Sequence, residues 1–379
     1  MPNLRPLFAA FFLTACSSSS PVQPGPDAGS DSMPAADAGV LTCPKGTHLD
    51  DTGMFCDSTL NISRSMVTIA PIRDHHSTYI AETKAGTYLY VFAGTDAWKT
   101  LHDDVQRAKI AADGSLGAFE VVSKLPAVRA GQCIIVKNGR VTLMGGTDGN
   151  MMIASTVSAT IDPNDGSVGA WTAGPDLPEP VMHESCDVWN DWVYVMGGRS
   201  QFGGGSTATS ARAKLGPDGA IASFEKLADL QPDRSHHQSF VLHDRLYLAG
   251  GLTGNPVGNT AMLHKDIVFA PIAADGTLGD WQKAGDLAAP LSITNATVYG
   301  DAVYFLGGLE GGSSYSAKVL RATFDAAGML SAASQIGKLM NGRGHVHNCP
   351  MFGNFMYSVG GHDSFDKSLG TIDIIRFDG

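Results

Sequence analysis

The chain has 379 residues, of which 43% are hydrophobic and 17% are charged, a balance typical of a globular protein. Its formal net charge of −11 argues against nucleic acid as a partner, because a phosphate backbone attracts clustered Lys and Arg. The chain contains 45 glycines in 379 residues, which is more than the usual glycine content of about 7%. This excess predicts a fold rich in turns.

The first residues predict an export signal. Arg5 precedes an apolar run, Leu7 to Leu13, that is too short to span a membrane. The run closes on LTAC, which resembles the bacterial lipoprotein box, in which the signal is cut before the cysteine and the cysteine carries lipid; an ordinary signal peptide is the alternative. The resemblance implies a signal peptide at 1–15, a lipidated Cys16 and a bacterial envelope location. Ser17 after the cysteine favours the outer membrane, and the lipid is then the expected membrane contact.

Two short segments separate this signal from the repeats. Residues 16–40 are rich in Ser, Pro, Gly and Ala, and they predict a flexible tether because they cannot bury enough apolar surface to fold. In residues 41–58, Cys43 and Cys56 flank a loop that contains glycine. In an exported protein such a pair is more often a disulfide than a metal site, so we expect a disulfide there.

From residue 59 to 379 one pattern occurs six times. Each copy contains a short strand, a tight polar turn and a second strand that ends in two small residues. A third strand then closes on Asp-Gly, with Ala327-Gly328 as a weak copy in the fifth unit, and in the first four units a fourth strand opens with an aromatic residue. The last glycines of the small pairs are Gly94, Gly146, Gly198, Gly251, Gly308 and Gly361, at intervals of 52, 52, 53, 57 and 53 residues. Four antiparallel strands in a repeat of about 50 residues predict an all-β propeller of six blades.

The last repeat ends where the others turn into their fourth strand. An open ring would expose two sheet edges, so we expect the N-terminal end of the repeat region to supply the missing strand. The sequence favours pairing of Met66 to Ile69 with Ile372 to Phe377.

The repeats resemble a known family. The glycine pairs, the later aromatic residues and linkers such as LPAVRAGQC resemble the kelch repeat, and the DGSVGAW pattern resembles bacterial secreted kelch-like lipoproteins. The resemblance implies a kelch-type propeller, but it implies little about function, because one fold hosts many activities.

Polar residues gather in the linkers before the first strand of each repeat. In a blade these linkers share one face with the loops after the glycine pairs, so their side chains could point toward a central mouth. Counting back from the glycine pairs places Glu184, His237 and His347 at equivalent positions, and favours His76 for the same position. The candidate residues are Arg73, His75, His76, Arg129, His183, Glu184, Arg234, His236, His237, Arg343, His345 and His347.

Two interpretations of these linkers remain open. The side chains could form a pocket for an anionic sugar or a metal, or they could bond backbone and tie the blades together, which we favour. We expect no metal and no cofactor, because no His-x-x-x-His or paired-carboxylate motif accompanies the histidines. Cys133, Cys186 and Cys349 begin innermost strands; Cys133 could lie near Cys186, but we expect buried free thiols.

The longest loops after the glycine pairs, 199–210 and 252–265, are a second candidate surface, because loops on rigid scaffolds concentrate binding function. We therefore expect a monomeric binding module that recognises a protein or a glycan through its loop face. The alternative is a sugar-modifying enzyme resembling the bacterial sialic-acid mutarotases, with a His, Arg and Glu mouth. No catalytic motif of that family is matched, so the sequence favours a binding protein over an enzyme.

The lipoprotein signal gives the first testable prediction. Replacing the cysteine by serine (Cys16→Ser) removes the thiol that would carry lipid, so the variant should move from the membrane fraction to the soluble fraction of disrupted cells. Immunoblotting of both fractions measures this, with Ser17→Ala as a control that should stay with the membranes. Unchanged membrane association of Cys16→Ser would contradict the lipoprotein interpretation.

Overall fold

The structure is a computed structural model that describes residues 47–49, 56–255, 261–311, 314–364 and 366–378. The predicted signal peptide, Cys16, the tether and Cys43, and with it the predicted Cys43–Cys56 disulfide, lie outside the described residues. In the described ranges the chain forms strands and loops, with no helix that could cross a membrane.

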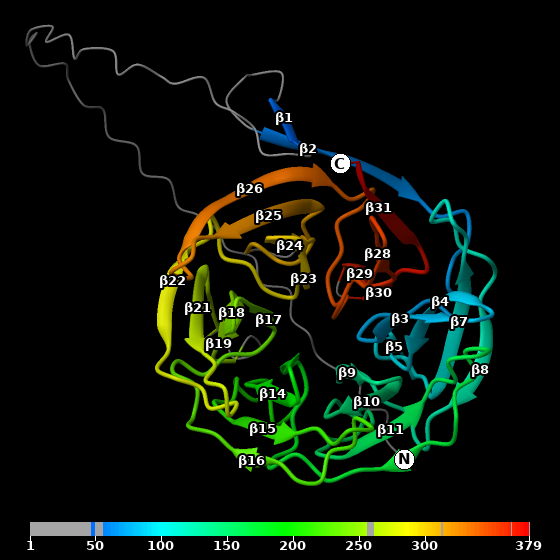
Figure 1. Ribbon diagram of the computed structural model, residues 1–379, viewed down its shortest axis with the longest axis horizontal. Helices are drawn as coiled ribbons and strands as arrows, with labels where there is room; N and C mark the ends of the chain where they lie inside the picture. The colour runs from blue at the N-terminus through cyan, green and yellow to red at the C-terminus, as the bar shows by residue number, and fades with distance from the viewer. Residues whose placement is uncertain (1–46, 50–55, 256–260, 312–313, 365, 379) are drawn as a thin grey trace, which may run out of the picture.

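Six antiparallel sheets surround a central axis in the described part of the chain, which confirms the predicted all-β propeller (Figure 1). In the first five of these sheets the strands follow one another in chain order from the axis outward, whereas the sixth takes its outer strands from the beginning of the chain. The first three blades consist of β3 (Ser77–Thr83), β4 (Gly86–Phe92), β7 (Asp104–Ile110) and β8 (Glu120–Lys124); β9 (Cys133–Lys137), β10 (Arg140–Met144), β11 (Thr156–Thr160) and β12 (Thr172–Ala173); and β13 (Ser185–Trp189), β14 (Trp192–Met196), β15 (Ser210–Lys214) and β16 (Glu225–Lys226).

The other three blades repeat this order, and the last one also receives strands from the beginning of the chain. They consist of β17 (Gln238–Leu242), β18 (Arg245–Ala249), β21 (Asp266–Pro271) and β22 (Gln282–Asp286); β23 (Ala296–Tyr299), β24 (Ala302–Leu306), β25 (Lys318–Phe324) and β26 (Leu330–Lys338); and β27 (Met351–Phe352), β28 (Phe355–Val359), β31 (Ile372–Asp378), β2 (Cys56–Arg64) and β1 (Thr47–Leu49).

The innermost hairpins turn where the sequence carries residues that accept positive φ. Between β9 and β10, Asn138 and Gly139 have φ of 52° and 77°, the geometry of a two-residue hairpin turn whose twist matches that of the strands. His243 and Asp244 make the equivalent turn between β17 and β18, with φ of 49° and 55°.

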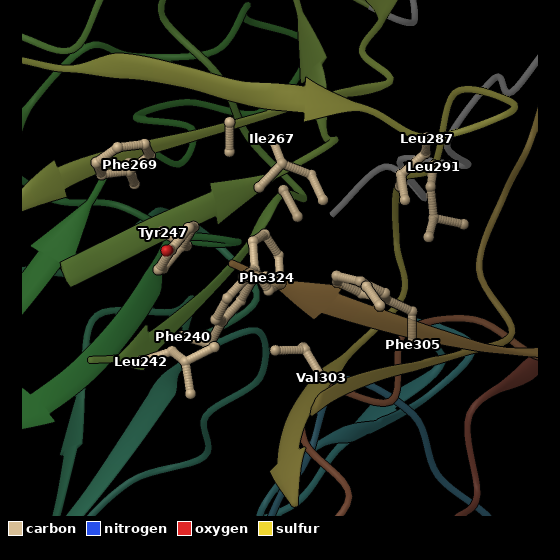
Figure 2. Close-up of a cluster of buried hydrophobic side chains, with 13 residues drawn as sticks. Phe240, Leu242, Tyr247, Ile267, Phe269, Leu287, Leu291, Val303, Phe305 and Phe324 are labelled. Carbon is tan, nitrogen blue, oxygen red and sulfur yellow. The ribbon is translucent and has the colours of Figure 1, made fainter. Parts of the chain in front are cut away.

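Apolar side chains from adjacent blades form the core. Between the fourth and fifth blades, Tyr247 stacks on Phe240 at 4.8 Å, and Phe305 and Phe324 of the next blade close the cluster (Figure 2). The Tyr247 hydroxyl also donates to the carbonyl of Gly328 in that next blade, at 3.2 Å. The same bond recurs in the pairs Tyr90–Gly166, Tyr194–Gly276 and Tyr357–Gly114, so the second strand of four blades is tied to its neighbour's Asp-Gly or Ala-Gly turn.

The N-terminal strand closes the ring, as predicted, but it is a different segment. β2 pairs with β31 from Thr59 opposite Asp378 to Arg64 opposite Asp373. The prediction that Met66 to Ile69 form this strand was wrong, and Met66 is 98% exposed. The reason is distance, because the chain needs the residues after Arg64 to cross from the outer edge of the sixth blade to the axis, where the first blade begins.

Closure gives a stability prediction. Removal of residues 1–64 deletes β1 and β2 and leaves β31 as an unpaired edge, so the free energy of unfolding should fall by several kcal/mol and aggregation should rise. Removal of residues 1–46 is the control, because it keeps both strands. Melting temperature and light scattering measure the difference; equal melting of the two truncations would show that β2 does not hold the ring closed.

Candidate functional site

Six peptide groups, one from each linker, form a closed ring around the axis. One residue in each linker has a left-handed φ between 52° and 70°. Its N–H donates to the carbonyl of the equivalent residue in the neighbouring blade, with N···O distances of 2.8–3.2 Å. We call these residues the axial ring; they are His75, Gly131, His183, His236, Ile293 and His345.

The histidines of the axial ring bring their imidazoles together on the axis. The ring centroids of His75 and His345 are 3.9 Å apart, as are those of His183 and His236, and His75 lies 5.0 Å from His183. His347 lies 5.8 Å and His362 lies 5.4 Å from His75. These six side chains form what we call the imidazole cluster: His75, His183, His236, His345, His347 and His362.

The imidazoles of the axial ring are neutral at pH 7. Burial lowers the pKa of His183, His236 and His345 well below the ordinary value of 6.5, and the neighbouring imidazoles lower it further. Burial lowers the pKa of His75 as well, so four histidines are held close together on the axis without mutual charge repulsion.

Asp74 holds one side of the imidazole cluster. Its carboxylate accepts from His75 Nδ1, from His362 Nε2 at 3.2 Å and from the Ser368 hydroxyl. Burial alone would raise the pKa of Asp74, but the electrostatic interaction with His75 and the hydrogen bonds from both histidines outweigh burial and lower that pKa. Asp74 is therefore an ionised acceptor that fixes the orientation of two imidazoles.

The residue after each ring position turns away from the axis and lies between blades. A Cβ on Gly94 would lie 2.8 Å from the Cβ of His76, and one on Gly251 would lie 2.6 Å from the Cβ of His237. His237 Nε2 also faces the hydroxyl of Ser185, in the preceding blade, at 2.9 Å. His76 and His237 thus fill space beneath the glycine pairs, and they are structural.

The predicted equivalence of His347 with His237 was wrong by one residue. The side chain of Val346 lies against Gly361, and a Cβ added to Gly361 would be 2.6 Å from it. Val346 thus occupies the place that His237 takes against Gly251. The last linker holds one more residue between this place and the glycine pair. His347 is consequently displaced onto the axis, where it joins the imidazole cluster.

The four candidate arginines point into the blades and not into a pocket. Arg73 donates to the Ala93 carbonyl at 3.0 Å and makes a two-bond ion pair with Asp104. Arg234 repeats this arrangement with Gly250 and Asp266. Arg343 bonds Gly360 and Asp373, and Arg129 bonds Gly145 and Ser155. These guanidinium groups hold the linkers, as the structural interpretation predicted.

A cavity of about 110 Å³, room for several waters, adjoins the imidazole cluster along the channel. Its wall includes His183, His345 and two acids, Glu184 and Asp187. Burial raises the pKa of Glu184 to about 8 and that of Asp187 to about 7, although the Ser239 hydroxyl donates to Asp187. Both carboxyl groups can therefore exchange protons near neutral pH.

Cys133 and Cys186 also line this cavity, and they form a disulfide between the second and third blades. The expectation of free thiols was wrong for this pair: the channel is narrow enough that Cα atoms of adjacent innermost strands lie 6.0 Å apart, within bonding reach. Cys349 is a buried free thiol, as predicted, and burial raises its pKa to about 12.

The loops after the glycine pairs cover the other side of the imidazole cluster. Trp98 lies 4.6 Å from His75 and 6.5 Å from Phe202, so loops of the first and third blades meet over the axis. Phe202 is 50% exposed, and Met151 and Met262 on loops of the second and fourth blades are 62% and 57% exposed. The loop face therefore presents apolar side chains from several blades.

Sequence reasoning missed several residues of this site. Asp74, Trp98, Asp187 and His362 contact the cluster or line the cavity, yet none belonged to the predicted set. His362 had a usable signal, since it directly follows the glycine pair and every such loop begins at the mouth. Asp187 had none, because it lies within an innermost strand and only the radius of the channel brings it to the cavity.

The chain is similar in structure to the solved protein YjhT, with a TM-score of 0.62 over 80% of this chain and 95% of that one, at 13% sequence identity. At this identity the likeness concerns the fold alone. No protein-family model matches the sequence, and no curated protein matches it.

Asp187 gives a pH prediction. The pKa of Asp187 is higher in the folded state than in the unfolded state, so the folded protein binds this proton more tightly. The contribution of Asp187 to the free energy of unfolding is therefore present at low pH and is lost as pH rises through about 7. Between pH 6 and 8 the wild type should lose about 1 kcal/mol of stability relative to Asp187→Asn, after allowance for the partial exposure of the carboxyl group. Urea unfolding of both proteins measures this; parallel pH profiles would contradict it.

Proposed function

We propose that this protein is a binding protein of the bacterial cell envelope, held to the outer membrane by lipid on Cys16, which recognises a protein ligand through its loop face. The tethering part rests on the lipoprotein-like signal and on the resemblance of the repeats to secreted kelch-like lipoproteins. A disulfide between Cys133 and Cys186 is in keeping with an exported protein, because such bonds persist in oxidising compartments.

The apolar loop face is the observation that carries the binding proposal. Met151, Phe202 and Met262 stand on loops of three consecutive blades and are each at least half exposed. Exposed aromatic and methionine side chains are enriched at protein interfaces, where their burial provides much of the affinity. The rigid propeller beneath them fixes their spacing, so the free energy of binding is not spent on ordering the surface.

Site-specific crosslinking tests this proposal. A photoreactive amino acid at position 202 or 262 of the full chain in intact cells should capture the same discrete protein, because both positions lie on the proposed face. Met329 is the matched control, an apolar residue 41% exposed beside the turn at the opposite end of the blades. Identical adduct patterns from all three positions, or adducts from none, would contradict the proposal. Binding to glycans alone on an array would show that the ligand is a carbohydrate and not a protein.

A sugar-modifying enzyme is the second candidate, and the acids of the cavity favour it. Glu184 and Asp187 have pKa values near neutrality, a property that general acids and bases share. Anomer exchange of an anionic sugar, followed by NMR, should then be faster with wild-type protein than with Asp187→Asn. Equal exchange rates with and without protein would exclude this function.

A further inference from the structure

We propose that the axial ring binds one divalent transition-metal ion, zinc or copper, through the imidazoles of His75, His183 and His345. One ring nitrogen from each of these residues lies within 4.8 Å of the other two. Imidazole is a preferred ligand of both ions, and three imidazoles from the protein leave a coordination position open for another group.

Three imidazole nitrogens of this group lack the hydrogen-bond partners that buried polar atoms normally have. All three side chains are more than nine-tenths buried. His75 Nε2 and both nitrogens of His183 have no hydrogen-bond partner among the described residues. Because a buried unpaired polar atom destabilises a folded protein, such atoms indicate a missing partner. A metal ion bound by His75 Nε2 and by one nitrogen of His183 would supply a partner to both.

Supporting residues orient these imidazoles as they do in known metal sites. Asp74 accepts a hydrogen bond from His75 Nδ1, which leaves Nε2 as the free lone pair, the arrangement of a carboxylate–histidine–metal triad. The Tyr315 hydroxyl faces His345 Nδ1 at 3.4 Å, and with this nitrogen as the donor Nε2 of that ring keeps its lone pair for coordination.

The backbone does not require histidine at these positions. Gly131 and Ile293 occupy two of the six places in the axial ring, with φ of 70° and 59° and the same inter-blade hydrogen bonds. Glycine adopts such a φ more readily than histidine does. The histidines at the other places are consequently better explained by what their side chains bind than by the ring itself.

A second group of possible ligands, Asp74, His75 and His362, is less suited to a metal. Both nitrogens of His362 already face acceptors, the Ser364 carbonyl and Asp74. Asp74 accepts from Ser368 and from the Ala97 N–H as well. His183 and His345, by contrast, line the cavity, which leaves room for a further ligand beside an ion bound to these two imidazoles.

Metal analysis of the full chain, purified without a histidine tag, tests the proposal. After treatment with a chelator, titration with Zn²⁺ and with Cu²⁺ should give one bound ion per chain by mass spectrometry of the metal, and a melting temperature that rises with ion concentration. Cobalt substitution should give the visible spectrum of a nitrogen-ligated ion. A wild-type protein that binds none of these ions would overturn the proposal.

Variants then assign the ligands. His183→Gln and His345→Gln should each lose the bound ion and the thermal shift, whereas His237→Gln, a buried histidine of the same linkers that faces Ser185, should keep both. Circular dichroism verifies folding, and two ligand variants guard against the misfolding of one. If His362→Gln loses the ion while His183→Gln keeps it, the Asp74 group is the site and our assignment is wrong.

Discussion

The axial ring is the constraint on which the rest of the structure depends. Buried backbone groups must be paired, and here each linker pairs its N–H with the carbonyl of the next linker, so that six blades close a circle at their narrowest radius. The left-handed φ at each ring position sends successive side chains in different directions. His236 faces the axis, and His237, its neighbour in the chain, enters the space between two blades.

The glycine pairs follow from this ring. The second glycine of each pair donates its N–H to the linker of the next blade, as Gly94 does to Arg129 and Gly198 to Arg234. The first glycine leaves no room for a side chain: a Cβ on Gly250 would collide with the Leu291 carbonyl. The six small pairs in the sequence are therefore the places where one blade's backbone approaches its neighbour's linker too closely for a larger residue.

Most of the fold could be predicted from the sequence, because the spacing of the glycine pairs repeats over the whole propeller and fixes four strands per blade. The site could be predicted only as a set of linkers. Which of two adjacent histidines faces the axis depends on a backbone conformation that has no residue signature, since His75, Gly131 and Ile293 all adopt it. The Cys133–Cys186 bond and the closing strand β2 depended on the width of the channel and the path of a linker, which local patterns do not contain.

A propeller converts one position of its repeat into a cluster. Histidines 53 residues apart, such as His183 and His236, are a long way from any local ligand motif, yet their imidazoles lie 3.9 Å apart on the axis. Trp98 and Phe202 cover that cluster on the loop side, while the cavity adjoins it along the channel. One scaffold therefore carries two separate features: an outer loop face with exposed apolar side chains, and a buried axis lined by imidazoles. Changes to the exposed apolar loops need not disturb the axis, because the axial ring is held by backbone bonds between linkers.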